Sequence, residues 1–278
     1  MHTHTLASRT VFGAGALVLV AGAASLVSVA PEEARATVAS SPDSVTLTGV
    51  IRDFKTSHPD FETYPWGGHF RNLVADTLDQ EGKPYFNEKL LDNMDWDDIP
   101  VTSAETMAQW FRDVPGVNTS WTHDIELTRD GDIYTFSRRR PNYFFPADGK
   151  GFGNSEGPLR WASPGSHNYH FTMEIDTEFT YIDPAKRDYE MVFTFTGDDD
   201  VWVFINNRLA VDIGGVHGQI SESINLDDAA EELGLEPDGI YSLKLFFCER
   251  HTSESNFQIQ TTLVLRTAEL PTSAHLYD

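Results

Sequence analysis

Hydrophobic and polar positions alternate over much of this chain in the way that β-strands require. Residues 45–52 change between apolar and polar side chains with a period of two, which is typical of a strand with one buried face. Further alternating or apolar runs occupy residues 121–128, 133–137, 167–181, 189–196, 201–205, 208–213, 240–248 and 257–265. Asp130-Gly131 and Asn206-Asn207 separate neighbouring runs and predict hairpin turns. Because long helices do not alternate with these runs, the pattern predicts an all-β fold, an antiparallel β-sandwich.

One short helix interrupts the predicted strands. Thr102-Ser103-Ala104-Glu105 has the form of a capping box, and Met107, Trp110 and Phe111 follow at helical spacing. Residues 55–100 are rich in proline and glycine, so long loops are expected there. The acidic residues between 92 and 98 lack the spacing and the central glycine of an EF-hand, and a solvated loop is predicted for them.

The N-terminal segment has the pattern of an export signal. A basic residue, Arg9, precedes an apolar run rich in glycine and alanine, and cleavage is expected after Ala30 or Ala39. An uncleaved anchor is the alternative, because residues 11–30 are about long enough to span a bilayer. We expect a signal peptide at 1–39, a linker at 40–43, a folded domain at 44–265 and a tail at 266–278.

Composition narrows the possible partners. The chain has 278 residues and a formal net charge of −23, so it repels nucleic acid and attracts divalent cations. Cys248 is the only cysteine, which excludes an internal disulfide. We expect a secreted or cell-surface protein, exported by a bacterium, that does not insert into a membrane once its signal is removed.

Three consecutive carboxylates, Asp198, Asp199 and Asp200, lie between two predicted strands. Like charges this close repel each other, and calcium prefers oxygen ligands, so the cluster predicts a calcium site. Neighbouring side chains on a regular strand point to opposite faces, so a bulge or a cis peptide is needed to bring Asp198 and Asp199 together. For Asp200 the role of a ligand and the role of a turn residue stay equally open.

Other candidate residues have simpler interpretations. His217 and His251 lack the spacing of a zinc site. A structural hydrogen bond is predicted for Asp212. Trp202 and Phe204 lie in a strand that is apolar on both faces, so they are predicted to be core residues. Trp66, in a loop, is the candidate for stacking on a sugar.

Three separate motifs resemble the fibro-slime domain, a member of the PA14 β-sandwich superfamily. They are Phe-Thr-Gly-Asp-Asp-Asp-Val-Trp-Val-Phe-Ile-Asn at 195–206, Asp-Ile-Gly-Gly-Val-His at 212–217, and Phe-Phe-Cys-Glu-Arg-His-Thr-Ser-Glu-Ser-Asn-Phe at 246–257. The resemblance extends over residues 44–265. It implies a PA14-like β-sandwich with one short helix and long loops.

The resemblance also implies a function. In PA14 adhesins, two adjacent aspartates joined by a cis peptide bind calcium, and sugar hydroxyls coordinate that calcium directly. Asp198 and Asp199 match these aspartates, and Glu249 begins the loop that supplies a further ligand, often an asparagine. Glu249 is either such a metal ligand or one partner of an ion pair with Arg250 or another basic residue. Sugar contacts are expected at Asp198, Asp199, Arg250, His251 and Asn256, and the alternative for the last three is to hold their loop against neighbouring carboxylates.

The sequence therefore predicts an exported, calcium-dependent carbohydrate-binding or adhesion module whose partners are glycans or extracellular matrix. A structural matrix protein that uses calcium only to stabilise its loops is the alternative. An enzyme is not expected, because no nucleophile elbow, metalloprotease motif or phosphate loop is present. A glycoside hydrolase needs only two carboxylates and is the remaining, less favoured possibility.

Overall fold

The computed structural model describes residues 41–62 and 68–267. The expected signal peptide, Trp66 and most of the expected tail lie outside the described residues. No helix within the described part is both long enough and apolar enough to cross a membrane.

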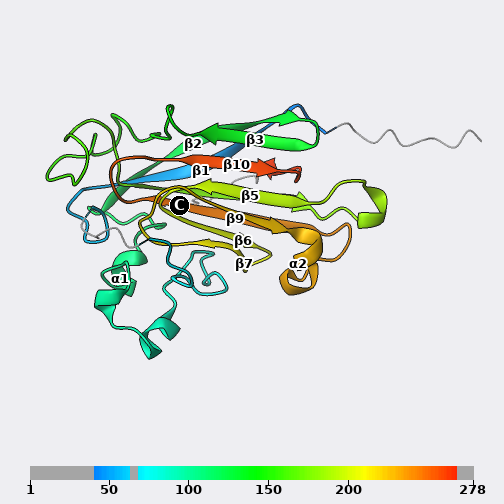
Figure 1. The fold of residues 1–278 in the computed structure, drawn as a ribbon, viewed down its shortest axis with the longest axis horizontal. Helices are drawn as coiled ribbons and strands as arrows, with labels where there is room; N and C mark the ends of the chain where they lie inside the picture. The colour runs from blue at the N-terminus through cyan, green and yellow to red at the C-terminus, as the bar shows by residue number, and fades with distance from the viewer. Residues whose placement is uncertain (1–40, 63–67, 268–278) are drawn as a thin grey trace, which may run out of the picture. The chain divides into compact units, whose positions relative to one another are not determined.

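Strands make up most of the described chain. They are β1 Ser44–Phe54, β2 Asn118–Asp130, β3 Ile133–Arg138, β4 Phe171–Thr180, β5 Val192–Gly197, β6 Asp200–Ile205, β7 Arg208–Ile213, β8 Ile220–Asn225, β9 Ile240–Glu249, β10 Phe257–Thr261 and β11 Arg266–Thr267. The helices are α1 Ala104–Met107 and α2 Leu226–Leu233, with 3-10 turns at Glu88–Asp92, Trp96–Asp98 and Pro184–Lys186. The two α-helices lie near opposite ends of the strands (Figure 1).

All of these strands belong to one antiparallel sheet that folds over itself. Its order is β7-β6-β9-β4-β1-β2-β3-β10-β5-β8, with β11 beside β4. The hairpin between β2 and β3 carries the chain from one layer to the other. The layers then pack face to face: the ring centroid of Phe247 in β9 lies 5.1 Å from that of Phe257 in β10 and 6.3 Å from that of Phe195 in β5. This arrangement confirms the antiparallel sandwich.

Strand β6 is buried on both faces, as its apolar sequence predicts. Val201, Val203 and Ile205 belong to the core between the layers. Trp202 and Phe204 belong to a second core, in which the loop-rich region before β2 covers the outer face of the sheet. The long loops therefore bury strand surface, and β6 is held from both sides just after the three aspartates.

The turns and the first helix follow local sequence signals. Asn206 and Asn207 both have positive φ, at 49° and 63°, which is the conformation of a primed hairpin turn. Helix α1 has a capping box, but it begins one residue later than predicted: Ser103 is the N-cap and Thr106, not Glu105, is its partner. The acidic residues 92–98 lie in and beside short 3-10 turns and are exposed in the main.

Strand β8 and helix α2 were not predicted. Strand β8 is rich in polar residues, and none of its residues is buried. Helix α2 carries Leu226, Ala229, Ala230 and Leu233 at helical spacing, so its apolar periodicity was present in the sequence. Its end signals are also present, since Asn225 caps its first turn and Gly234 takes the left-handed conformation after its last. Pairing of β11 with β4 also carries the sheet two residues past the boundary expected at 265.

Candidate functional site

The three aspartates lie where β5 passes into β6. Gly197 ends β5 and Asp200 begins β6, so Asp198 and Asp199 form the connection, and a cis peptide joins them. Strand β9 pairs with β6 in a register that places Cys248 opposite Asp200. Glu249, the last residue of β9, therefore reaches the same end of the sheet as the aspartates.

Asn256 holds the carboxylate of Asp198. Its backbone N–H donates to Oδ1 of Asp198 at 2.6 Å, and its side-chain Nδ2 donates to Oδ2 at 2.7 Å. Its own Oδ1 accepts from the N–H of Arg140 at 3.3 Å. The expected direct sugar contact of Asn256 is thus replaced by a supporting one, because its amide is buried and engaged on both sides.

Two backbone amides from different loops hold the carboxylate of Asp199. The N–H of His217 donates to Oδ1 at 3.1 Å, and the N–H of Arg250 donates to Oδ2 at 3.2 Å. The loop after β7 and the loop after β9 therefore meet at this one side chain.

The carboxylate of Asp200 is engaged by other groups of the protein and does not line the cavity described below. Its carboxylate forms a buried two-point ion pair with Arg250, with Nε to Oδ2 at 2.6 Å and Nη2 to Oδ1 at 3.1 Å. Its Oδ1 also accepts from the N–H of Gly215 at 2.6 Å. Asp200 is a structural residue that fixes the loop after β7.

The predicted sugar contact of Arg250 is corrected by the same geometry. Its side chain is fully buried, its Nη1 donates to the carbonyl oxygens of Pro100 and Asp60, and its guanidinium lies 4.8 Å from the centre of the Trp110 ring. The sugar role fails because every polar edge of the guanidinium faces the protein interior.

Glu249 is fully buried, and neither of its carboxylate oxygens accepts a hydrogen bond of good geometry. Burial raises its pKa well above the usual range, and the charges of Asp199 and Asp198 raise it further, although weaker contacts with Ser255 and the His251 amide act in the opposite direction. The alternative of an ion pair with Arg250 is not realised, since Arg250 pairs with Asp200. A buried, unpaired carboxylate beside two others is an arrangement that a cation would stabilise.

A cavity of about 320 Å³ opens beside the aspartates. It is lined by Trp161, Asp198, Asp199, Val216, His217, Gly218, His251, Thr252, Ser253 and Glu254. Trp161 is 52% exposed, and its ring centroid lies 4.8 Å from that of His251 and 5.2 Å from the guanidinium carbon of Arg160. The cavity therefore combines carboxylates, imidazoles and one partly exposed indole.

Burial shifts the pKa values of the carboxylates in this region upward. It raises the pKa of Asp198 to about 6, against the two hydrogen bonds from Asn256. For Asp199, burial and the charges of Asp198 and Asp200 raise the pKa well above its usual value. The remote, buried Asp53 also has its pKa raised by burial to about 6.

The raised pKa of Asp198 predicts its own share of the pH dependence in the calcium-free protein. A carboxyl with a folded pKa raised from 3.8 to about 6 contributes stability that is fully present below 3.8 and lost as the pH rises through 6. Buried and partly buried histidines act in the opposite direction over the same range, because burial lowers the pKa values of His58, His123, His170 and His217. We therefore expect wild type to gain about 1 kcal/mol in the free energy of unfolding relative to Asp198→Asn between pH 7 and 5, measured by urea denaturation in EDTA. A difference between the two proteins that stays flat or changes sign over this range would contradict the prediction.

Asp212 was predicted to have a structural role, whereas two residues of the cavity were not predicted at all. Asp212 has the predicted structural role, because its carboxylate accepts from Trp202 Nε1 at 3.2 Å and from the N–H of Asn72 at 2.7 Å. His217 and Trp161 line the cavity but were not predicted as site residues. The signal for His217 was its place at the end of the second motif, whereas Trp161 lies in a long loop with no local signal.

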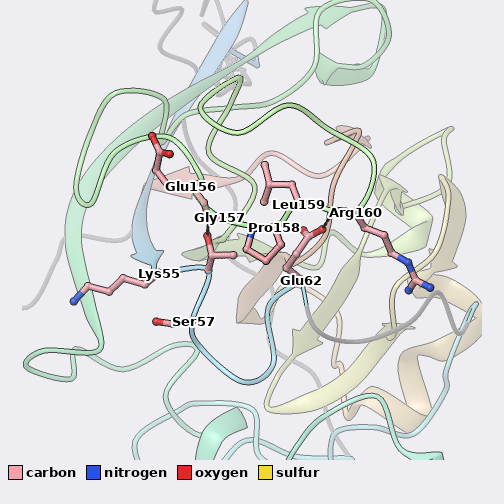
Figure 2. A pocket seen from close by; sticks show the side chains of 9 residues that line it. Lys55, Ser57, Glu62, Glu156, Gly157, Pro158, Leu159 and Arg160 are labelled. Atoms are coloured by element: carbon pink, nitrogen blue, oxygen red, sulfur yellow. Dashed lines mark hydrogen bonds between the residues drawn. The ribbon is translucent and has the colours of Figure 1, made fainter.

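A larger cavity of about 860 Å³ lies beside Glu62, Leu159 and Arg160. Figure 2 shows the side chains of Lys55 and Arg160 extending outward on opposite sides of it. Of the buried, unpartnered polar atoms in the described part of the chain, none belongs to a residue that lines it. The smaller cavity, which is lined by His217 and His251 with their unpartnered nitrogen atoms, is therefore the better candidate for a binding site.

Glu62 connects the walls of the two cavities. Its Oε1 accepts from the N–H of Arg160 at 2.5 Å, an interaction drawn in Figure 2, and from the hydroxyl of Thr252 at 3.0 Å. Its Oε2 accepts from the N–H of Thr252 at 3.2 Å and lies 3.4 Å from Nε2 of His170. Burial alone would raise the pKa of Glu62, but these partners together lower it. An ionised Glu62 therefore holds the loops that carry Trp161 and His251.

The described residues form an antiparallel sandwich with an acidic pair at one strand end and loops that close over that pair. Residues 159–273 match the family model of the PA14 domain, the superfamily that the three sequence motifs resemble.

Several relatives come from Dictyostelium discoideum. The chain is 40% identical to protein psiD over 228 residues, covering 80% of this chain and 42% of psiD. It is 38% identical to protein psiR over 235 residues, covering 81% of this chain and 22% of psiR. The chain thus spans less than half the length of these relatives. They give no support to the bacterial origin expected from the sequence.

Solved structures with lower similarity include two PA14 domains. One is from the MpAFP antifreeze protein, with 10% identity, a TM-score of 0.29, and coverage of 84% of this chain and 98% of the other. The second is described as a PA14 sugar-binding domain from an RTX adhesin, with 8% identity, a TM-score of 0.27, and coverage of 77% and 88%.

Proposed function

We propose that this chain is a calcium-dependent carbohydrate-binding module that acts in adhesion outside the cell. The observation that carries the proposal is the cluster of Asp198, Asp199 and Glu249, in which neither buried oxygen of Glu249 accepts a hydrogen bond of good geometry. The PA14 match supports the class of function.

The residues present fit a calcium ion. Asp198 and Asp199 would supply carboxylate oxygens from the cavity wall, and Glu249 would supply negative charge, or a ligand, from behind. No group of three His, Cys, Asp or Glu side chains among the described residues forms a ready-made metal site. Calcium suits such an incomplete set, because it takes six to eight oxygen ligands in flexible geometry and accepts backbone carbonyls, water and ligand hydroxyls.

The protein's own contribution is to position and screen the ion. Backbone amides from His217 and Arg250 orient Asp199, while Asn256 orients Asp198. The half-exposed Trp161 lines the same cavity and would contact a ligand bound there. A bound calcium would supply the electropositive centre to which two sugar hydroxyls coordinate.

Calorimetry of the purified chain tests the proposal. We expect calcium to bind one site, and we expect a glycan array to give signals in calcium that EGTA removes. Magnesium is the control cation, since its stricter octahedral geometry suits this open set of ligands poorly. Glycan binding that is unchanged by EGTA, or no binding of either ligand, would refute the proposal.

A structural role is the second candidate, because a cation would also relieve the repulsion among the three buried carboxylates without any sugar. In that case calcium would raise the melting temperature while no glycan on the array binds. Export and a glycan or matrix partner belong to the proposal, and the absence of enzymatic activity stays a prediction.

A further inference from the structure

Several buried polar atoms around the small cavity have no hydrogen-bond partner, and most of them are potential hydrogen-bond acceptors. His217 and His251 each have an unpartnered Nε2, and both oxygens of Glu249 are unpartnered close by. His217 and His251 are only 4% and 3% exposed. The hydroxyl of Ser255 also makes no hydrogen bond of good geometry and can both donate and accept, whereas each Nε2 can accept a hydrogen bond when its imidazole is neutral.

Backbone carbonyls set the tautomer of both imidazoles. Nδ1 of His217 lies 2.8 Å from the carbonyl oxygen of Gly218, and Nδ1 of His251 lies 2.7 Å from that of Thr252. A carbonyl oxygen can only accept, so each Nδ1 carries the proton. In the neutral ring, Nε2 then presents a lone pair.

The two rings belong to the two loops that meet at Asp199. His217 donates its own N–H to Oδ1 of Asp199, and Arg250, the residue before His251, donates its N–H to Oδ2. The loops after β7 and β9 thus bring one imidazole each to the cavity, and the carboxylate is shared between them. A ligand placed over the aspartates would have an acceptor from each loop beside it.

We infer that His217 and His251 are specificity-determining residues for a neutral polyol ligand, a sugar whose hydroxyls donate to the two Nε2 atoms. This inference rests on the proposed function, in which two other hydroxyls coordinate the cation. Anionic groups such as phosphate or carboxylate cannot donate to Nε2, so the two imidazoles select against them.

The experiment measures calcium and sugar binding separately by calorimetry. The sugar probes are the methyl glycosides of galactose, glucose, mannose and fucose, in saturating calcium. His217→Phe and His251→Phe keep the ring volume and remove the acceptor, and each is expected to weaken binding of the preferred glycoside about tenfold. Calcium affinity should stay within about threefold of wild type. His123→Phe, at a partly buried histidine on β2, is the matched control and should change neither affinity.

The outcomes separate this inference from the proposed function. Unchanged sugar affinity in both phenylalanine variants would overturn the inference and leave calcium-dependent binding intact. If wild type binds no calcium but its sugar affinity depends on the two histidines, the proposed calcium role fails and the recognition role stands. Absence of binding by all four glycosides would overturn the inference.

Single-deoxy forms of the preferred glycoside provide a test on the unmodified protein, in case a phenylalanine variant does not fold. Two deoxy positions outside the calcium-binding pair are expected to weaken binding about tenfold each. His217→Gln and His251→Gln, which keep an acceptor, should lose less affinity than the phenylalanine variants. Equal affinity for all deoxy forms outside the calcium-binding pair would overturn the inference.

Discussion

Replacing Asp199 by asparagine is expected to lower calcium affinity at least about 100-fold and to remove calcium-dependent glycan binding with it. The charge of the site and the number of anionic ligands govern calcium affinity, and Asp199 is the carboxylate at the meeting point of both loops. Isothermal titration with calcium measures the first effect, and the glycan array measures the second.

The same substitution should leave the calcium-free fold intact. Asparagine keeps one side-chain oxygen for the amide of His217 or Arg250, while removing the charge relieves repulsion from Asp198. We expect the free energy of unfolding in EDTA to change by no more than about 1 kcal/mol, because these effects oppose each other. Asp97→Asn, in the exposed acidic region, is the control and should not affect calcium. Normal calcium affinity in Asp199→Asn would place the ion elsewhere.

Replacing Arg250 by methionine is expected to destabilise the domain by about 3–5 kcal/mol. The substitution leaves Asp200 charged and buried without its partner. It also removes the hydrogen-bond donor of the carbonyl oxygens of Asp60 and Pro100. Equilibrium urea denaturation measures the loss. Arg250→Lys should recover only part of it, because an ammonium cannot form the two-point contact with a carboxylate.

The matched control is Arg71→Met. Arg71 forms an ion pair with Glu222, but its side chain is 53% exposed, so its loss should cost less than about 1 kcal/mol. Adding Asp200→Asn to Arg250→Met should restore part of the stability, since the unpaired charge is then gone. An Arg250→Met protein as stable as wild type would show that the ion pair has no structural role.

Local patterns were sufficient to predict the features that depend on neighbouring residues. The alternation in β1, the double apolar face of β6 and the Asn206-Asn207 turn are set within a few positions. The cis connection at Asp198-Asp199 was also one of two predicted solutions, because strand geometry alone cannot place both carboxylates together.

Features that depend on distant residues were not predictable in the same way. Arg250 lies between two residues of the site, but its partners at Asp60 and Pro100 stand 190 and 150 positions earlier in the chain. The aromatic residue beside the cavity is Trp161, and nothing in its own loop marks it. Helix α2, by contrast, was not predicted although Leu226, Ala229, Ala230 and Leu233 recur at helical spacing in its sequence.

Glu62 holds two loops of the site in fixed positions before any ligand binds. Through one carboxylate it joins the amide of Arg160 to the amide and hydroxyl of Thr252, and these residues adjoin Trp161 and His251. The aromatic wall and the imidazole wall are thus already fixed to each other before a ligand arrives. Binding then loses little conformational entropy in these loops, and the domain is preorganised for its ligand.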